Sequence, residues 1–152
     1  MVTIRNATSE DKDVIVDFQL AMALETETIH LDVETVSKGV EAVLKDATKG
    51  KYFVAEMDGE IVGSLLITFE WSDWRNGVVY WIQSVYVMIK YRNKGVFREL
   101  YAHVKKIADN SEEIVGIRLY VDVTNEKAQI VYGNLGMDGD HYKVFEWMCD
   151  KT

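Results

Sequence analysis

The sequence predicts an α/β (α+β) fold in which a mixed β-sheet is covered by helices. Short strand-like runs alternate with segments whose apolar residues recur at helical spacing. Two turn signals in the middle of the chain also join neighbouring strands. The resulting order is β-α-α-β-β-β-α-β-α-β. Because the chain has no internal repeat, low-complexity tract or Gly/Ser linker, we interpret residues 1–152 as one domain.

The first part of the chain predicts one short strand and two helices. TIRNA is typical of a strand, and Thr8 with Asp11 resembles a capping box that opens a helix ending near Leu24. Asp32 can cap a second helix. The apolar stripe of that helix comprises Val36, Val40, Val43 and Leu44.

Three consecutive strands are predicted next. KYFVAEM and EIVGSLLITF flank Asp58-Gly59, a pair typical of two-residue hairpin turns. A second turn at 75–77 leads into the long strand VVYWIQSVYVMI. These segments therefore predict three successive strands joined by two turns.

The last part of the chain predicts two helices and two strands. GIRLYVDV is an apolar strand, Asn125 opens a short helix, and Gly136 closes it as a left-handed residue. The alternating tail HYKVFEWMCD predicts a final strand. The helix before GIRLYVDV has one apolar face, formed by Val96, Phe97, Leu100, Tyr101, Val104, Ile107 and Ala108.

Composition excludes several classes of protein. The net charge of −8 argues against a general nucleic-acid or anionic-membrane binder, and is compatible with a cationic substrate such as an amine. One cysteine, Cys149, permits no internal disulfide and no cysteine-based metal site, and the three histidines show no ligand spacing, so we expect no metal. We expect a cytoplasmic protein, because no apolar run is long enough for a membrane span and no signal-peptide core is present.

The stretch YRNKGVF, residues 91–97, lies where a predicted strand turns into a helix. A connecting loop explains it, since glycine in a basic turn is common. An anion cradle explains it equally well, because main-chain N–H groups at a helix N-terminus can bind phosphate.

Two motifs together resemble the GNAT superfamily of N-acetyltransferases. YRNKGVF before a long helix is similar to its R/Q-x-x-G-x-G/A motif, and NEKAQIVYGNLGM is similar to Asn-x-x-Ala-x-x-x-Tyr-x-x-x-Gly-Phe. The resemblance covers nearly the whole chain. It departs at Phe97, where Gly or Ala is usual, at Met137, which replaces Phe, and at Ile89, where Pro is frequent. The resemblance implies a mixed central sheet of six to seven strands flanked by about four helices.

The resemblance also implies acetyl-CoA as the co-substrate. The coenzyme's diphosphate would lie on the turn before the long helix, and its pantetheine arm would lie along a strand, opposite RLYVDV. Gly95 is needed either for close approach or for its φ angle. The implied cofactor-binding residues are Val85, Tyr86, Val87, Arg92, Asn93, Lys94, Gly95, Val96, Phe97, Arg98 and Asn125.

Tyr132 occupies the position of the family's tyrosine, so the resemblance implies that it donates a proton to the departing thiolate. Many family members have a glutamate where this chain has Gln83, which cannot take a proton from the amine. We therefore expect Glu70 to be the base, with Asp73 nearby, and Trp71 and Trp74 to suit a cation. A twisted hairpin packed by its own tryptophans explains this loop equally well. Glu25 and Glu27 are further acceptor-side candidates. The substrate residues are thus Glu27, Trp71, Asp73 and Gln83.

We expect an N-acetyltransferase that acts on a primary amine in a small molecule, an amino acid or a peptide. The alternative is a non-catalytic acyl-CoA-binding module of the same fold, in which Gln83 reflects lost chemistry. A different phosphate-binding protein is disfavoured because the usual nucleotide-binding glycine loops are missing. The resemblance also implies a possible homodimer, while neither a nucleic acid nor a membrane is expected as a partner.

Overall fold

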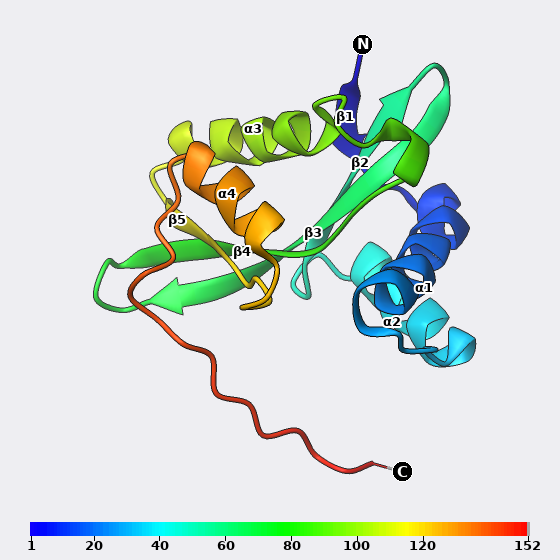
Figure 1. The fold of residues 1–152 in the computed structure, drawn as a ribbon. Helices are drawn as coiled ribbons and strands as arrows, with labels where there is room; N and C mark the ends of the chain where they lie inside the picture. Colours follow the sequence, from blue (N-terminus) through cyan, green and yellow to red (C-terminus); the bar gives the residue numbers. More distant parts are fainter. Residues whose placement is uncertain (152) are drawn as a thin grey trace. The chain divides into compact units, whose positions relative to one another are not determined.

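The computed structural model describes residues 1–151, and its elements follow in the predicted order up to the last helix (Figure 1). In chain order they are β1 Thr3–Asn6, η1 Ser9–Asp11, α1 Lys12–Glu27, α2 Val33–Lys45, β2 Lys51–Met57, β3 Glu60–Ser72, β4 Gly77–Val87, η2 Ile89–Tyr91, α3 Val96–Asp109, β5 Ile114–Leu119 and α4 Glu126–Asn134.

The chain forms two compact units, Met1–Leu119 and Tyr120–Thr152. The first unit holds a five-stranded sheet in the order β1-β2-β3-β4-β5, together with α1, α2 and α3. Neighbouring strands are antiparallel from β1 to β4, whereas β4 and β5 are parallel. The second unit holds α4 and the tail. One domain over the whole chain stays a prediction.

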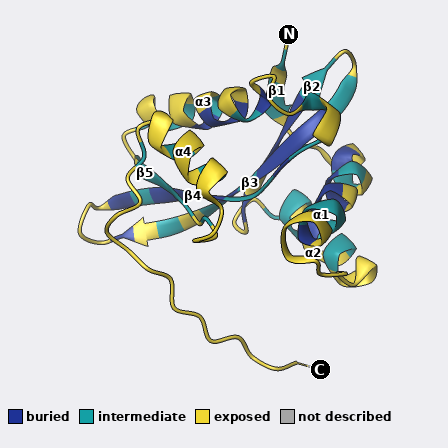
Figure 2. Cartoon of the chain, in the orientation of Figure 1, coloured by how far each residue is buried: buried dark blue, intermediate teal, exposed yellow. Residues whose placement is uncertain are grey.

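Helices cover both faces of the sheet. Tyr52 and Val54 of β2 pack with Ile15 and Val16 of α1 in one hydrophobic cluster. Phe53, which lies between them, places its ring 5.2 Å from the ring of His103 on α3. Because successive strand residues point to opposite faces, α1 and α2 cover one face and α3 covers the other. The central strands are accordingly the most buried part of this unit (Figure 2).

The predicted caps and turns are confirmed. Asp32 accepts a hydrogen bond from the Thr35 N–H at 2.9 Å, and Thr8 with Asp11 forms the capping box. Asp58 and Gly59 both have positive φ angles, 55° and 77°, as a tight hairpin turn requires. The first helix extends to Glu27, beyond the predicted end.

A partly buried ion pair fixes the start of α1 to the sheet. The Asp11 carboxylate accepts hydrogen bonds from Arg5 Nη1 at 2.8 Å and Nη2 at 3.0 Å, and also from the Thr8 N–H at 2.7 Å. The Arg5 guanidinium is the main reason that the pKa of Asp11 lies below its ordinary value. Asp11 is only 4% exposed, so this network anchors the first helix within the core.

Two strand predictions are wrong. The sheet of residues 1–151 has five strands, not six to seven, because HYKVFEWMCD forms no strand. Tyr142, Phe145 and Trp147 are 80%, 94% and 85% exposed. An alternating pattern gives a segment the capacity to pair, but a strand exists only where a neighbouring strand supplies hydrogen bonds. The strand predicted for GIRLYVDV also ends early, at Leu119.

Candidate cofactor and acceptor site

Strand β4 extends further than its parallel neighbour β5. Their pairing ends at Ile82 and Leu119, whereas β4 remains paired with β3 as far as Val87 and Gly63. The last part of β4 therefore has a neighbouring strand of this sheet on one side only. This open edge is the feature that a strand-like pantetheine arm requires.

Alternation along β4 identifies the main-chain groups at the open edge. The Met88 N–H donates to the Val62 carbonyl at 2.8 Å, so the main chain of Met88 faces β3. Because N–H and C=O groups change sides at each residue, Tyr86 also faces β3, and Val85 and Val87 face the open edge. Val85 and Val87 are thus the main-chain candidates, whereas Tyr86 contributes its side chain.

A β-bulge bends β4 where the edge opens. Tyr86 pairs with Ser64, but the next pair joins Gln83 to Leu66, which leaves one extra residue on β4. Ser84 has a φ angle of 52°, in the left-handed region. Since a bulge bends a strand and increases its twist, this irregularity accounts for the separation from β5.

The turn between β4 and α3 presents main-chain donors. Asn93 and Gly95 have φ angles of 63° and 82°, and α3 begins at Val96. The Glu99 N–H donates to the Gly95 carbonyl at 3.0 Å, so the N–H groups of Val96 and Arg98 precede this first turn of the helical ladder. A Cβ built on Gly95 would meet no atom within 4 Å, so it is the φ angle that requires glycine here.

Side chains around this turn leave its main chain accessible. Val96 is only 2% exposed and anchors the helix start in the core. Phe97 is half-buried, with its ring centre 6.3 Å from that of Tyr101, so this departure from the family motif is accommodated along α3. Lys94 and Arg98 are exposed, and together with the helix dipole they make the turn electropositive.

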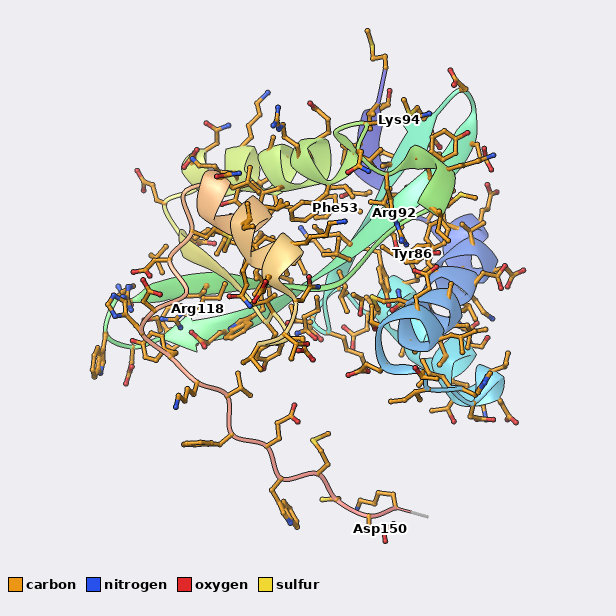
Figure 3. The ribbon with its side chains drawn as sticks, in the orientation of Figure 1. Phe53, Tyr86, Arg92, Lys94, Arg118 and Asp150 are labelled. Atoms are coloured by element: carbon orange, nitrogen blue, oxygen red, sulfur yellow. The ribbon has the colours of Figure 1, made fainter. Side chains whose placement is uncertain are left out.

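Arg92 points back from the turn toward α1 (Figure 3). Its Nε donates to the Val87 carbonyl at 2.8 Å, and its Nη2 donates to Glu25 Oε2 at 2.7 Å. The Tyr86 hydroxyl donates to Glu25 Oε1 at 3.0 Å, and the Arg92 guanidinium lies 5.3 Å from the centre of the Tyr86 ring. Arg92, followed by Tyr86, lowers the pKa of Glu25, so this carboxylate is held ionised. Sequence reasoning did not connect Glu25 with Arg92, because 67 residues separate them.

Glu70 belongs to a second polar cluster, on the face of the sheet to which the Tyr86 side chain also points. Its Oε1 accepts a hydrogen bond from Trp81 Nε1 at 3.1 Å, and its Oε2 forms an ion pair with Arg118. Figure 3 draws Arg118 well away from Tyr86 and Arg92. Trp81 and Arg118 were missed from the sequence. Their strand register, in which Trp81 pairs with both Thr68 and Arg118, is the signal that would have identified them.

The other predicted acceptor residues do not gather around Glu70. Trp71 follows Glu70 in β3, so the two side chains point to opposite faces of the sheet. The role of Trp71 toward a cation stays a prediction. Asp73 is exposed in the following turn. Gln83 is half-buried and donates from Nε2 to Thr68 Oγ1. Glu27 is exposed at the last residue of α1.

Two predicted residues lie in the second unit. Asn125 caps α4 by accepting a hydrogen bond from the Ala128 N–H at 3.1 Å. Tyr132 lies within α4 and is half-buried, and burial raises the pKa of its phenol above the ordinary value of 10.0. This phenol therefore stays protonated at neutral pH, as a proton donor must.

The described residues contain neither a candidate metal site nor a candidate membrane-spanning helix. Within residues 1–151, histidine, cysteine, aspartate and glutamate side chains form no group of three that could hold a metal ion. Over the same range, every helix is too short or too polar to cross a bilayer.

The comparisons with known proteins agree with the resemblance found in the motifs. The family model described as the acetyltransferase (GNAT) family matches residues 20–137. No curated protein matches the chain at a significant level. The crystal structure of a possible acetyltransferase from Clostridium difficile 630 is 43% identical, with a TM-score of 0.92 over 99% of both chains.

More distant structures share the fold alone. A probable acetyltransferase is 24% identical, with a TM-score of 0.85 over 99% of both chains. The acetyltransferase AAC(6')-Iy, in complex with a bisubstrate analogue that contains CoA, is 18% identical, with a TM-score of 0.77 over 99% of both chains. Since the family model spans more than half of the chain, this protein belongs to the GNAT acetyltransferase family.

Proposed function

We propose that the protein is an acetyl-CoA-dependent N-acetyltransferase that acts on a primary amine by direct attack in a ternary complex. The acceptor class comprises small amines, amino acids and peptide amino groups. The observation that carries the proposal is the start of α3, where a left-handed Gly95 precedes a helix N-terminus directly after the open edge of β4. The family uses acetyl-CoA, which supplies an activated acetyl group as a thioester.

The proposed binding residues fall into two groups. The N–H groups around Gly95, Val96 and Arg98 would meet the negative charge of the diphosphate, supported by the dipole of α3. The main-chain groups of Val85 and the N–H of Val87, whose carbonyl already accepts a hydrogen bond from Arg92, would pair with the amide groups of the pantetheine arm, as a neighbouring strand does. These contacts depend on the backbone, so they tolerate the departures at Phe97 and Ile89. Asn93, Phe97 and Asn125 stay further candidates from the motifs.

Tyr132 is our proposed general acid. Its phenol can donate a proton or a hydrogen bond to the sulfur that leaves during the reaction. Burial supports this role, because it keeps the phenol protonated at neutral pH. The motif around Tyr132 is what assigns the role.

Glu70 is our proposed base or water-orienting group. A carboxylate offers about four lone-pair positions, and donors from Trp81 and Arg118 engage one on each oxygen. The remaining positions can accept a proton from an amine or orient a water molecule. Glu25 is less suited to be the base, because its ion pair with Arg92 lowers its pKa.

A non-catalytic acyl-CoA-binding module is the second candidate. Gln83 stands where many family members have glutamate, and it is bonded to Thr68 instead. Glu70, a carboxylate on the same strand pair, is already ion-paired with Arg118. Both observations favour a fold that binds the coenzyme without a free base.

One experiment separates the two candidates. Release of free thiol from acetyl-CoA should be followed with a panel of primary amines, for the wild type and for Tyr132→Phe, while calorimetry measures coenzyme A affinity. Amine-dependent turnover that falls in the variant, at unchanged affinity, supports the enzyme. Tight coenzyme A binding without turnover on any amine supports the binding module. The cytoplasmic location and the homodimer stay predictions.

A further inference from the structure

We propose that Glu25, Tyr86 and Arg92 form one positioning unit, which holds the C-terminal end of α1 against the open edge of β4 and thereby positions the acceptor amine. The inference rests on the proposed function, because it concerns the second substrate of the same reaction. It assigns Arg92 a role different from that of a phosphate ligand.

The unit joins three distant parts of the chain. Glu25 lies in the last turn of α1, which ends at Glu27 before a left-handed Thr28 with a φ angle of 56°. Tyr86 lies in β4, and Arg92 follows η2. Both Glu25 oxygens are engaged, Oε1 by the Tyr86 hydroxyl and Oε2 by Arg92. The end of the helix is therefore fixed at two points, to β4 and to the segment that follows η2.

Arg92 contacts the helix and the open edge at the same time. Its Nε donates to the carbonyl of Val87, a residue whose main chain faces the open edge, and its Nη2 donates to Glu25. The planar guanidinium makes both bonds from one rigid group while it lies over the Tyr86 ring. A lysine ammonium is a single point charge and cannot reproduce this geometry.

The charge of Arg92 is matched within the unit. Because Glu25 neutralises it, the field at the turn before α3 comes mainly from Lys94, Arg98 and the helix dipole. Two roles of Arg92 then predict different effects of removing the Glu25 charge. If Arg92 binds the diphosphate, removing the Glu25 charge releases the guanidinium and strengthens coenzyme A binding. If Arg92 instead holds the end of α1 in place, the same change leaves the coenzyme A affinity unaltered and raises the KM for the amine.

The test uses Glu25→Gln, Arg92→Lys and the double variant, with Asp17→Asn as the control. Asp17 is exposed on the same helix, so its variant makes the same charge change away from the unit. Calorimetry gives the Kd for coenzyme A, steady-state kinetics give kcat and KM for the amine, and thermal unfolding shows that each variant folds. We expect each single variant to raise the amine KM about fivefold, the effect of one partly exposed ion pair. The double variant should be no worse than either single variant, and the coenzyme A Kd should stay within twofold.

Three results would overturn the inference. The first is a tenfold change in coenzyme A Kd with an unchanged amine KM. The second is a double variant whose fold-increase in amine KM equals the product of the two single increases, because the free-energy effects of substitutions at independent residues are additive. The third is an amine KM equal to that of the wild type in every variant. Absence of wild-type turnover with all amines would instead refute the proposed function, and this inference with it.

Discussion

Replacing Gly95 with alanine tests the main-chain phosphate site with a single methyl group. Gly95 has a φ angle of 82°, and an added Cβ would meet no protein atom within 4 Å. The substitution therefore adds backbone strain without a clash. An L-residue in the left-handed region costs about 1–2 kcal/mol. For a chain of this length, we expect the melting temperature to fall by about 2–8 °C.

Coenzyme A affinity should fall by much more than strain alone explains. If the Cβ or a shifted turn displaces one N–H donor from the diphosphate, the lost hydrogen bond to a charged group is worth about 1.5–3 kcal/mol. That free energy corresponds to a Kd about tenfold to 150-fold higher. Calorimetry with coenzyme A measures the change directly.

Gly59→Ala is a matched control for this variant. Gly59 has a φ angle of 77° in the β2–β3 hairpin, and its added Cβ would also meet nothing within 4 Å. Both variants should therefore lose similar stability, but only Gly95→Ala should lose affinity. Equal melting temperatures together with equal, wild-type affinities for coenzyme A would refute the proposed role of the turn.

Three further predictions concern single side chains. Tyr132→Phe should lower kcat about 100-fold or more at unchanged coenzyme A affinity, and the wild-type pH–rate profile should show no loss from this phenol below about pH 10, because burial raises its pKa. A kcat equal to that of the wild type would remove Tyr132 from the chemistry. Asp11→Asn should lower the free energy of unfolding by about 1–2 kcal/mol at pH 7, an amount reduced by the partial exposure of Arg5. Because the folded-state pKa of Asp11 is depressed, this contribution is present above the ordinary value of 3.8 and is lost as the pH falls through the folded pKa, so urea titrations at falling pH should show the difference shrink. Ser64→Ala should leave stability unchanged or raise it by about 1 kcal/mol, because the buried Ser64 Oγ has no hydrogen-bond partner among the described residues. A lower free energy of unfolding for Ser64→Ala than for the wild type would contradict that explanation.

Local signals in the sequence predicted most of the fold. Caps such as Asp32 and turns such as Asp58-Gly59 act through the nearest few residues, so a linear pattern is sufficient to find them. The turn at Gly95 was predictable for the same reason, because its φ angle and the following helix are local properties. The tail was predicted wrongly because pairing depends on a partner strand, which alternation does not supply.

The side chains of the site were harder to predict. The pairing of Glu70 with Trp81 and Arg118 depends on strand register, both across the β3–β4 hairpin and between the parallel strands β4 and β5. The contact between Glu25 and Arg92 depends on how α1 packs on the sheet. Neither property can be read from spacing along the chain.

A crystal structure with coenzyme A bound tests the central claim most directly. The account predicts diphosphate oxygens within about 2.7–3.2 Å of the main-chain nitrogens around Gly95, Val96 and Arg98, and a pantetheine arm along Val85 and Val87. A diphosphate bound elsewhere, or held only by side chains while these amides face solvent, would contradict it.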